Sequence, residues 1–91
     1  MHGAIINADV KIGDNCIINS KALIEHDVVI GSHCHISTGA IINGGVEIGS
    51  GVFIGSGVVI REGILIGKNS VIGAGQIIKK NIPEGTTLKN F

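Results

Sequence analysis

Isoleucine recurs at every sixth position of this chain, from Ile6 to Ile78, without an insertion or a slip. A period of six does not follow one face of an α-helix, because six steps of about 100° place successive residues about 240° apart. A straight strand is excluded by the third position after each isoleucine, where residues that tolerate a positive φ predominate. That column is Asp9, Asn15, Lys21, Asp27, His33, Gly39, Gly45, Gly51, Gly57, Gly63, Asn69, Gly75 and Asn81. The sequence therefore predicts short strands that alternate with tight corners.

A second column, two residues before each isoleucine, carries the side chains that share its inward face. Its members are Val10, Cys16, Ala22, Val28, Cys34, Ala40, Val46, Val52 and Val58, followed less regularly by Ile64, Ser70, Gln76 and Ile82. Three strands and three corners would close a triangular coil of about eighteen residues, with coils stacked at roughly 4.8 Å. We therefore expect an all-β parallel β-helix of about four triangular coils over residues 1–82, and a C-terminal tail over residues 83–91. Because the chain starts inside a repeat, we also expect an N-terminal part to be missing.

Composition supports a solenoid and limits the function. The 91 residues include fifteen glycines, two phenylalanines and neither Trp nor Tyr, which suits a repeat protein better than a globule with an aromatic core. A formal net charge of zero argues against a nucleic-acid partner. No apolar run reaches the roughly eighteen residues of a membrane span, and no signal peptide is visible, so we expect no membrane partner and a cytoplasmic location. Cys16 and Cys34 face inward on adjacent coils, and we expect two free thiols.

The hexad Ile12-Gly13-Asp14-Asn15-Cys16-Ile17 resembles the bacterial transferase hexapeptide repeat. This resemblance covers nearly the whole chain and implies that the parallel β-helix is left-handed. It also implies a homotrimer, which fits a feature of the outward-facing residues. One outward row is wholly aliphatic, and such a stripe on a small solenoid marks an interface. The row consists of Leu23, Ile41, Val59 and Ile77.

The corner sequence Glu25-His26-Asp27 is the candidate catalytic site. Histidines on solvated corners are common, and His2 and His33 are interpreted in that way. His26 differs because either flanking carboxylate, Glu25 as first choice and Asp27 as second, could orient its imidazole for general-base catalysis. If the aliphatic row faces the axis of a trimer, His26 of one subunit approaches His35 of the next.

The run Ile-Glu-His-Asp at residues 24–27, followed nine residues later by His35, resembles the sugar O- and N-acetyltransferases of sialic acid and bacillosamine-type pathways. The resemblance implies that His26 is the general base, that a neighbouring carboxylate assists it, and that His35 binds near the acetyl thioester. It also implies acetyl-CoA as co-substrate and a sugar or nucleotide sugar as acceptor, in cell-surface glycan synthesis.

Acetyl-CoA requires backbone donors along a groove and basic residues near its phosphates. Gly44 is expected one coil above His26, and Ser56 and Ala74 are expected to flank the pantetheine arm at the neighbour's corner. Lys79 is the basic candidate, in a C-terminal group of lysines that also contains Lys68, Lys80 and Lys89.

The sequence also leaves open two alternatives to an acetyltransferase. The sequence shows no counterpart of the N-terminal α/β domain of the related transferases or of their Gly-x-Pro-Ala-Lys-like ending. We therefore expect either a truncated transferase or, as the main rival, a non-catalytic trimerising β-helix module. A carbonic anhydrase-like metal site would suit histidines at a trimer interface. However, the local histidine spacings of seven, nine and two differ from the spacing of five in those enzymes, and we expect no metal.

Overall fold

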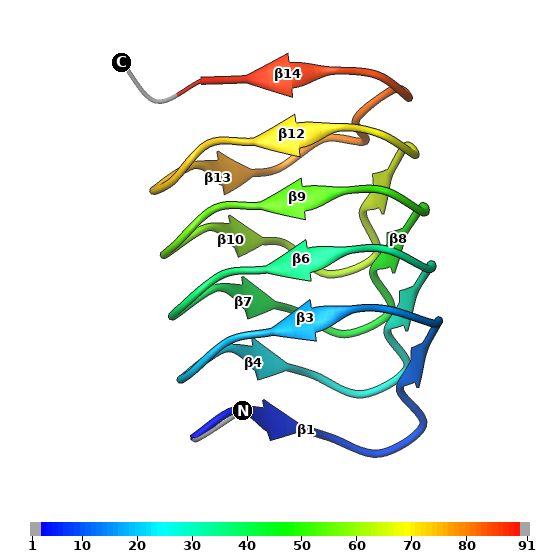
Figure 1. Ribbon diagram of the computed structural model, residues 1–91, viewed down its shortest axis with the longest axis vertical. Coiled ribbons are helices and arrows are strands. Elements are labelled where there is room, and N and C mark those ends of the chain that lie inside the picture. Colours follow the sequence, from blue (N-terminus) through cyan, green and yellow to red (C-terminus); the bar gives the residue numbers. More distant parts are fainter. Residues whose placement is uncertain (1–2, 90–91) are drawn as a thin grey trace.

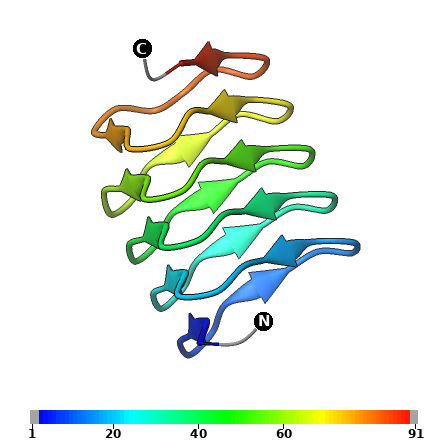
Figure 2. The same cartoon turned by 60° about the vertical axis from the view of Figure 1, so that its left-hand side comes forward.

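The computed structural model describes residues 3–89, so His2 and the last two residues of the expected tail lie outside the described part. Within that range every strand has two residues, and the strands lie on the three faces of a triangular prism (Figures 1 and 2). The described residues form no helix long and apolar enough to cross a bilayer. The all-β parallel architecture expected from the repeat is confirmed.

Three parallel sheets make up the faces, and each takes every third strand. The aliphatic sheet contains β1 (Ile5–Ile6), β4 (Leu23–Ile24), β7 (Ile41–Ile42), β10 (Val59–Ile60) and β13 (Ile77–Ile78). The mixed sheet contains β2 (Lys11–Ile12), β5 (Val29–Ile30), β8 (Glu47–Ile48) and β11 (Leu65–Ile66). The histidine sheet contains β3 (Ile17–Ile18), β6 (His35–Ile36), β9 (Phe53–Ile54), β12 (Val71–Ile72) and β14 (Thr87–Leu88).

The register of these sheets places each residue beneath the residue eighteen positions later. Leu23 pairs with Ile41, and Ile41 pairs with Val59, so the aliphatic row runs straight along its sheet. About five turns are present rather than about four, because β1 at one end and β14 at the other each add a strand. Strand β14 lies within residues 83–91, the segment expected to be a tail.

The core is a column of isoleucines and their smaller partners inside the prism. From Ile18 to Ile78 every ladder isoleucine is buried, as predicted. The inward partners from Ala22 to Ser70 are buried too, so each rung of the ladder packs between the rungs above and below. Full burial of one such aliphatic side chain stabilises the fold by about 1.5–3 kcal/mol. This stacked column takes the place of the single central core of a globular domain.

The first two rungs correct the expectation that every ladder isoleucine is buried. Ile6 is 39% exposed and Ile12 is 36% exposed. Both lie on strands at the N-terminal end of the prism, β1 and β2, each with a neighbouring strand on one side only. An edge position alone does not expose a rung, because Ile18 on the edge strand β3 is only 3% exposed.

The corner column behaves as the sequence predicts except at its last member. Even the two least typical residues, Lys21 and His33, adopt the left-handed conformation, with φ near 60°. Asn81 does not, and its assignment as a corner residue is wrong. The reason is that the last coil is shorter by two residues: Ile66 pairs with Ile82, sixteen positions later instead of eighteen.

The shortened corner changes the role of two residues. Ile82, expected among the smaller inward partners, takes the position of a rung above Ile66. The side-chain oxygen of Asn81 accepts a hydrogen bond from the backbone N–H of Leu65 at 2.9 Å. In the regular coils a backbone carbonyl fills that role, as the Ile64 carbonyl does for Glu47. Asn81 therefore closes the backbone ladder where the repeat ends.

The two cysteines are free thiols, as expected. The Sγ atom of Cys34 lies 3.1 Å from the carbonyl oxygen of Gly49, and Cys16 makes the same contact with Gly31 one coil below. Burial raises the pKa of the Cys34 thiol above its ordinary value, because desolvation disfavours the thiolate. Cys34 therefore behaves as a small apolar core residue with a weak S–H donor.

The difference in burial between rungs leads to a stability test with a matched control. Ile42→Ala should lower the free energy of unfolding by about 2–5 kcal/mol, because it opens a cavity at a fully buried position. Ile12→Ala, the same change at an exposed rung, should lower it far less. Urea denaturation followed by circular dichroism measures both, and equal losses would contradict the stacked-rung account of the core.

Candidate functional site

The prism has three edges, and the candidate residues divide among them. The His26 edge follows the aliphatic sheet and contains residues 7–10, 25–28, 43–46, 61–64 and 79–81. The Ser32 edge follows the mixed sheet, with residues 13–16, 31–34, 49–52 and 67–70. The Ser56 edge follows the histidine sheet, with residues 19–22, 37–40, 55–58 and 73–76.

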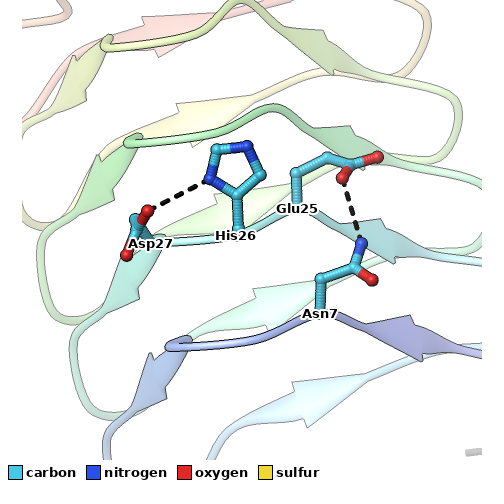
Figure 3. A network of polar contacts seen from close by, with 4 residues as sticks. All are labelled: Asn7, Glu25, His26 and Asp27. Carbon is cyan, nitrogen blue, oxygen red and sulfur yellow. Dashed lines mark hydrogen bonds and ion pairs between the residues drawn. The ribbon is translucent and has the colours of Figure 1, made fainter.

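At the corner after β4, Asp27 contacts His26. Its Oδ2 lies 3.1 Å from Nδ1 of the imidazole. Figure 3 shows the ring standing up from the corner with the Asp27 carboxylate at its Nδ1 side. An ionised carboxylate can only accept a hydrogen bond, so this contact places a proton on Nδ1 and leaves the lone pair of Nε2 available in the neutral ring. The side chain of His26 is 68% exposed, so Nε2 is accessible from solvent.

Glu25 does not hold the imidazole, which reverses the expected order of the two carboxylates. Its Oε1 accepts a hydrogen bond from the amide nitrogen of Asn7 at 3.0 Å (Figure 3). Asn7 lies directly below Glu25, eighteen residues earlier, so the stacking of coils supplies Glu25 with a partner. Asp27 has the shorter side chain and sits at the left-handed corner position, with φ 61°. That position brings its carboxylate beside the ring.

Gly44 lies one coil above His26, as predicted, and packs directly against the imidazole. A Cβ atom on Gly44 would lie 3.0 Å from Cε1 and 3.2 Å from Nε2 of His26. These distances are shorter than ordinary van der Waals contacts, so a side chain at this position would displace the ring. The glycine thus allows the ring to rest close to the backbone of the next coil.

A pocket of about 350 Å³ opens along the His26 edge. Glu25, His26 and Gly44 line it together with three residues that sequence reasoning missed: Asn43, Arg61 and Glu62. The missed residues had a signal, because each stands eighteen or thirty-six positions after Glu25 or His26. The same spacing that identified Gly44 identifies them.

Backbone N–H groups are satisfied differently along the three edges. On the Ser32 edge, the hydroxyl oxygen of Ser32 accepts the N–H of Asp14 at 3.0 Å, and Ser50 does the same for Ser32. On the His26 edge, no described residue accepts a hydrogen bond from the N–H of His26, Gly44 or Glu62. The N–H groups at the tips of the Ser56 edge likewise find no acceptor among residues 3–89. These tips are Ser20, Thr38, Ser56 and Ala74. On the Ser32 edge the N–H groups of Ser50 and Lys68 also find no acceptor among the described residues, so serine hydroxyls cap only two tips of that edge. The two edges that border the aliphatic sheet have no such cap at the tips named above.

His35 lies on another face from His26, as expected within one subunit. It belongs to β6 in the histidine sheet, and its ring packs against Phe53 with centroids 5.1 Å apart. The amide nitrogen of Asn19 lies 3.0 Å from Nε2 of His35. An amide NH₂ group donates, so Nε2 accepts and the proton of the neutral ring is on Nδ1.

The remaining candidates occupy separate places. Ser56 and Ala74 stack on the Ser56 edge, where the N–H of Gly75 donates to the Ser56 carbonyl at 2.9 Å. Lys79 lies at the last corner of the His26 edge, in the column of Glu25 and Arg61. With Lys80 it lines a second pocket of about 360 Å³ beside Ile82 and Leu88. The structure thus brings together Glu25, His26, Asp27 and Gly44, and it leaves His35, Ser56, Ala74 and Lys79 elsewhere on the same chain.

Metal ligands do not cluster in the part of the chain that the structure describes. Residues 3–89 hold no group of three or more His, Cys, Asp or Glu side chains placed to bind a metal ion.

Comparison with known proteins finds acetyltransferases among the solved structures whose fold resembles that of this chain. The chain matches WeeI from Acinetobacter baumannii AYE with a TM-score of 0.78 and 27% sequence identity, over 97% of this chain and 52% of WeeI. It matches the acetyltransferase domain of PglB from Neisseria gonorrhoeae FA1090, in complex with acetyl coenzyme A, with a TM-score of 0.73 and 23% identity, over 97% of this chain and 52% of that one. A variant of GDP-perosamine N-acetyltransferase from Caulobacter crescentus, in complex with CoA and GDP-perosamine, matches with a TM-score of 0.68 and 21% identity. This last match covers 97% of the present chain and 50% of the other.

The present chain therefore spans about half the length of these structures. No curated protein matches the sequence significantly. The family model of the bacterial transferase hexapeptide, built of six repeats, matches residues 9–44, 27–62 and 45–79 in overlapping stretches. Together these stretches cover the isoleucine ladder from Ile12 to Ile78 and all the residues that line the pocket of the His26 edge. The chain belongs to the bacterial transferase hexapeptide family, and its fold is the left-handed parallel β-helix that these repeats form.

Proposed function

We propose that this chain transfers the acetyl group of acetyl-CoA to an amino or hydroxyl group of a sugar or nucleotide sugar. The observation that carries the proposal is His26, which lines an open pocket, contacts Asp27 through Nδ1 and has no partner for Nε2 among the described residues. Acyl transfer needs such a base, because an amine or hydroxyl must lose a proton as it attacks the thioester carbonyl. The acetyl-CoA and GDP-perosamine complexes of the matching structures support the choice of donor and acceptor class.

In the proposed reaction, Nε2 of His26 accepts the proton of the attacking amine or hydroxyl. A bond forms between that nitrogen or oxygen and the acetyl carbon, and the carbonyl oxygen becomes negatively charged. Collapse of this intermediate breaks the bond between carbon and sulfur, and the thiolate of CoA takes up the proton from His26. Asp27 stabilises the imidazolium that exists between the two proton transfers, because its carboxylate accepts from Nδ1.

The negative charge on the carbonyl oxygen needs donors that are already in place. The N–H of Gly44 is one candidate, since it has no acceptor among the described residues and Gly44 contacts the ring of His26. The Nδ1–H of His35 is the other, supplied in this proposal by an adjacent subunit. Asn19 fixes the donor tautomer of that ring.

We propose that the active unit is a homotrimer that closes around the aliphatic sheets. The row from Ile5 to Ile77 stands on the outer surface, with Ile5 57% and Ile77 61% exposed. A threefold ring would cover this row and bring the His26 edge of each subunit against the Ser56 edge of the next. The free N–H groups of the two edges would then line one groove, suited to the amide groups of pantetheine. Ser56 and Ala74 flank that groove, and Lys79 lies towards its C-terminal end.

Replacing the proposed base tests the chemistry. His26→Ala should lower kcat roughly 10²–10⁴-fold, the usual contribution of a general base, and leave acetyl-CoA binding unchanged. Release of free CoA from acetyl-CoA measures turnover, and a thermal shift with acetyl-CoA measures binding. Trimers that show no such shift and no turnover would favour a non-catalytic module.

The shared groove provides a control for this experiment. His35→Ala should also lower turnover, and mixing the two single variants under conditions of subunit exchange should restore part of the activity. Mixed trimers can hold one groove with both histidines intact. Demonstrated exchange without any recovery would refute the pairing of His26 with His35 across subunits.

The interface has its own test. Ile41→Asp places a carboxylate in the centre of the aliphatic row and should convert the trimer to monomers, because an unpaired charge is expensive to bury. Sedimentation at micromolar concentration measures the assembly. Val29→Asp makes the same change at an exposed position of the mixed sheet and should leave the trimer intact. A wild-type chain that sediments as a monomer would remove the proposed interface altogether.

The contact between Gly44 and His26 predicts energetic coupling. In a His26→Ala background, Gly44→Ala should stabilise the protein by about 0.4–1 kcal/mol, because it restricts the unfolded chain. In the wild-type background the gain should be lost, because the new methyl group must push the imidazole aside. Urea denaturation of the four proteins gives the coupling energy, and a value near zero would mean that the two residues do not contact each other in solution.

A further inference from the structure

We propose that the acceptor is a small zwitterion, which places an amine at His26 and an anionic oxygen group, a phosphate ester or a carboxylate, at Arg61. This inference rests on the proposed function, because it assigns the acceptor of the same pocket. It identifies Arg61 as the residue that binds the anionic group of the acceptor and so determines acceptor specificity.

Arg61 supplies a positive charge to the pocket. It is the only arginine in the sequence, and it lines the pocket that contains His26. Two carboxylates, Glu25 and Glu62, line the same pocket, yet no ion pair or side-chain hydrogen bond joins Arg61 to any residue of the described range. An unpaired guanidinium in a pocket matches carboxylate and phosphate groups, which it can bind through two parallel hydrogen bonds.

The two carboxylates that line the pocket favour a positively charged group on the ligand. Glu25 uses one oxygen to accept from Asn7, and Glu62 is exposed without a partner in residues 3–89. With Arg61 positive and both carboxylates ionised, the charges lining the pocket sum to minus one. A ligand that is only anionic would meet these carboxylates unfavourably. A ligand that also carries an ammonium group can place its anionic group at Arg61 and its cationic group near the carboxylates, so complementarity to charges of both signs favours the zwitterion.

The stacking of coils sets the size of this acceptor. Arg61 stands two coils above Glu25 in one column, which corresponds to roughly 10 Å along the axis at about 4.8 Å per coil. Arg61 and His26 line the same pocket, whose volume is about 350 Å³. A single aminated sugar phosphate or an amino acid fits this space.

The chemistry balances without a further reactant. The ammonium group first releases one proton to solvent, and the free amine then attacks the acetyl carbon while Nε2 of His26 takes its second proton. The bond between carbon and sulfur breaks, and the thiolate receives that proton. The overall products are the amide, CoA as a free thiol and one proton in solution.

Isothermal titration of the intact protein with matched probes tests the proposal. D-glucosamine 6-phosphate carries both charges, D-glucosamine carries only the amine, and D-glucose 6-phosphate carries only the phosphate. L-serine and its amide, serinamide, form a second pair, which tests a carboxylate in place of the phosphate. We expect at least one zwitterion to bind roughly 10- to 100-fold more tightly than its singly charged analogues, the range for hydrogen bonds to charged groups.

Variants assign that preference to Arg61. Arg61→Gln should remove it and leave the affinity for D-glucosamine unchanged, and Arg61→Lys should restore part of it. Lys11→Gln removes one positive charge from an exposed position of the mixed sheet and should leave every affinity as in the wild type. Circular dichroism confirms that the variants fold. Wild-type protein that binds neither zwitterion more tightly than its analogues overturns the proposal, and so does a preference that survives Arg61→Gln.

A kinetic measurement separates this inference from the proposed function. If Arg61 binds the acceptor, Arg61→Gln raises KM for the zwitterion and not KM for acetyl-CoA. The reverse result means that Arg61 holds the phosphates of CoA and overturns the inference, while His26-dependent turnover keeps the proposed function intact. If the protein binds a zwitterion through Arg61 but does not bind acetyl-CoA, the inference about the ligand is supported. The proposed acetyl transfer is then contradicted.

Discussion

Backbone hydrogen bonds between successive coils are the constraint on which everything else in this structure depends. The N–H of Ile41 donates to the carbonyl of Val58 at 2.8 Å, and equivalent bonds recur along all three faces. Because these bonds keep the coils in register, each side chain stands above the one eighteen residues earlier until the last coil, where the spacing is sixteen. The buried isoleucines stack for this reason, and so do the residues of each edge. A site on this fold is therefore a column of residues taken from several coils.

The three columns at the edges are chemically different, although the backbone repeats almost identically. Hydroxyl groups of Ser32 and Ser50 occupy backbone donors on one edge. The His26 edge has no such caps over the described residues, and Gly44 there leaves room for the imidazole ring. The two edges without such caps border the aliphatic sheet, and the Ser32 edge, which is capped at two of its tips, lies opposite to it. This arrangement gives the prism a functional side, and it supports a groove shared between subunits as the place of the proposed reaction.

At the candidate site the backbone is held by hydrogen bonds, whereas the side chains are exposed. The backbone around His26 is held from both sides, since Asp27 N–H donates to Ala8 below and the His26 carbonyl accepts from Gly45 above. The side chains of His26 and Asp27 are nevertheless 68% and 64% exposed. Their ion pair is therefore weak as a source of stability, and its value is to orient the ring. Burial of the pair by an adjacent subunit would strengthen the contact, because a lower local dielectric increases the attraction between charges.

The sequence by itself determined the architecture, because a period of six with a φ-tolerant corner column admits hardly any other fold. It also placed Gly44 beside His26 through the eighteen-residue spacing, with Asp27 as the next residue in the chain. Only the tertiary structure decided that Asp27, and not Glu25, contacts the imidazole, since the choice depends on Asn7 one coil below. The shortened last coil was also beyond the sequence pattern, because Ile82 fits either inward column until its pairing with Ile66 is known. Arg61 and Glu62 lay within reach of the spacing rule, but their importance comes from the pocket, and a pocket is formed by the shape of several coils together.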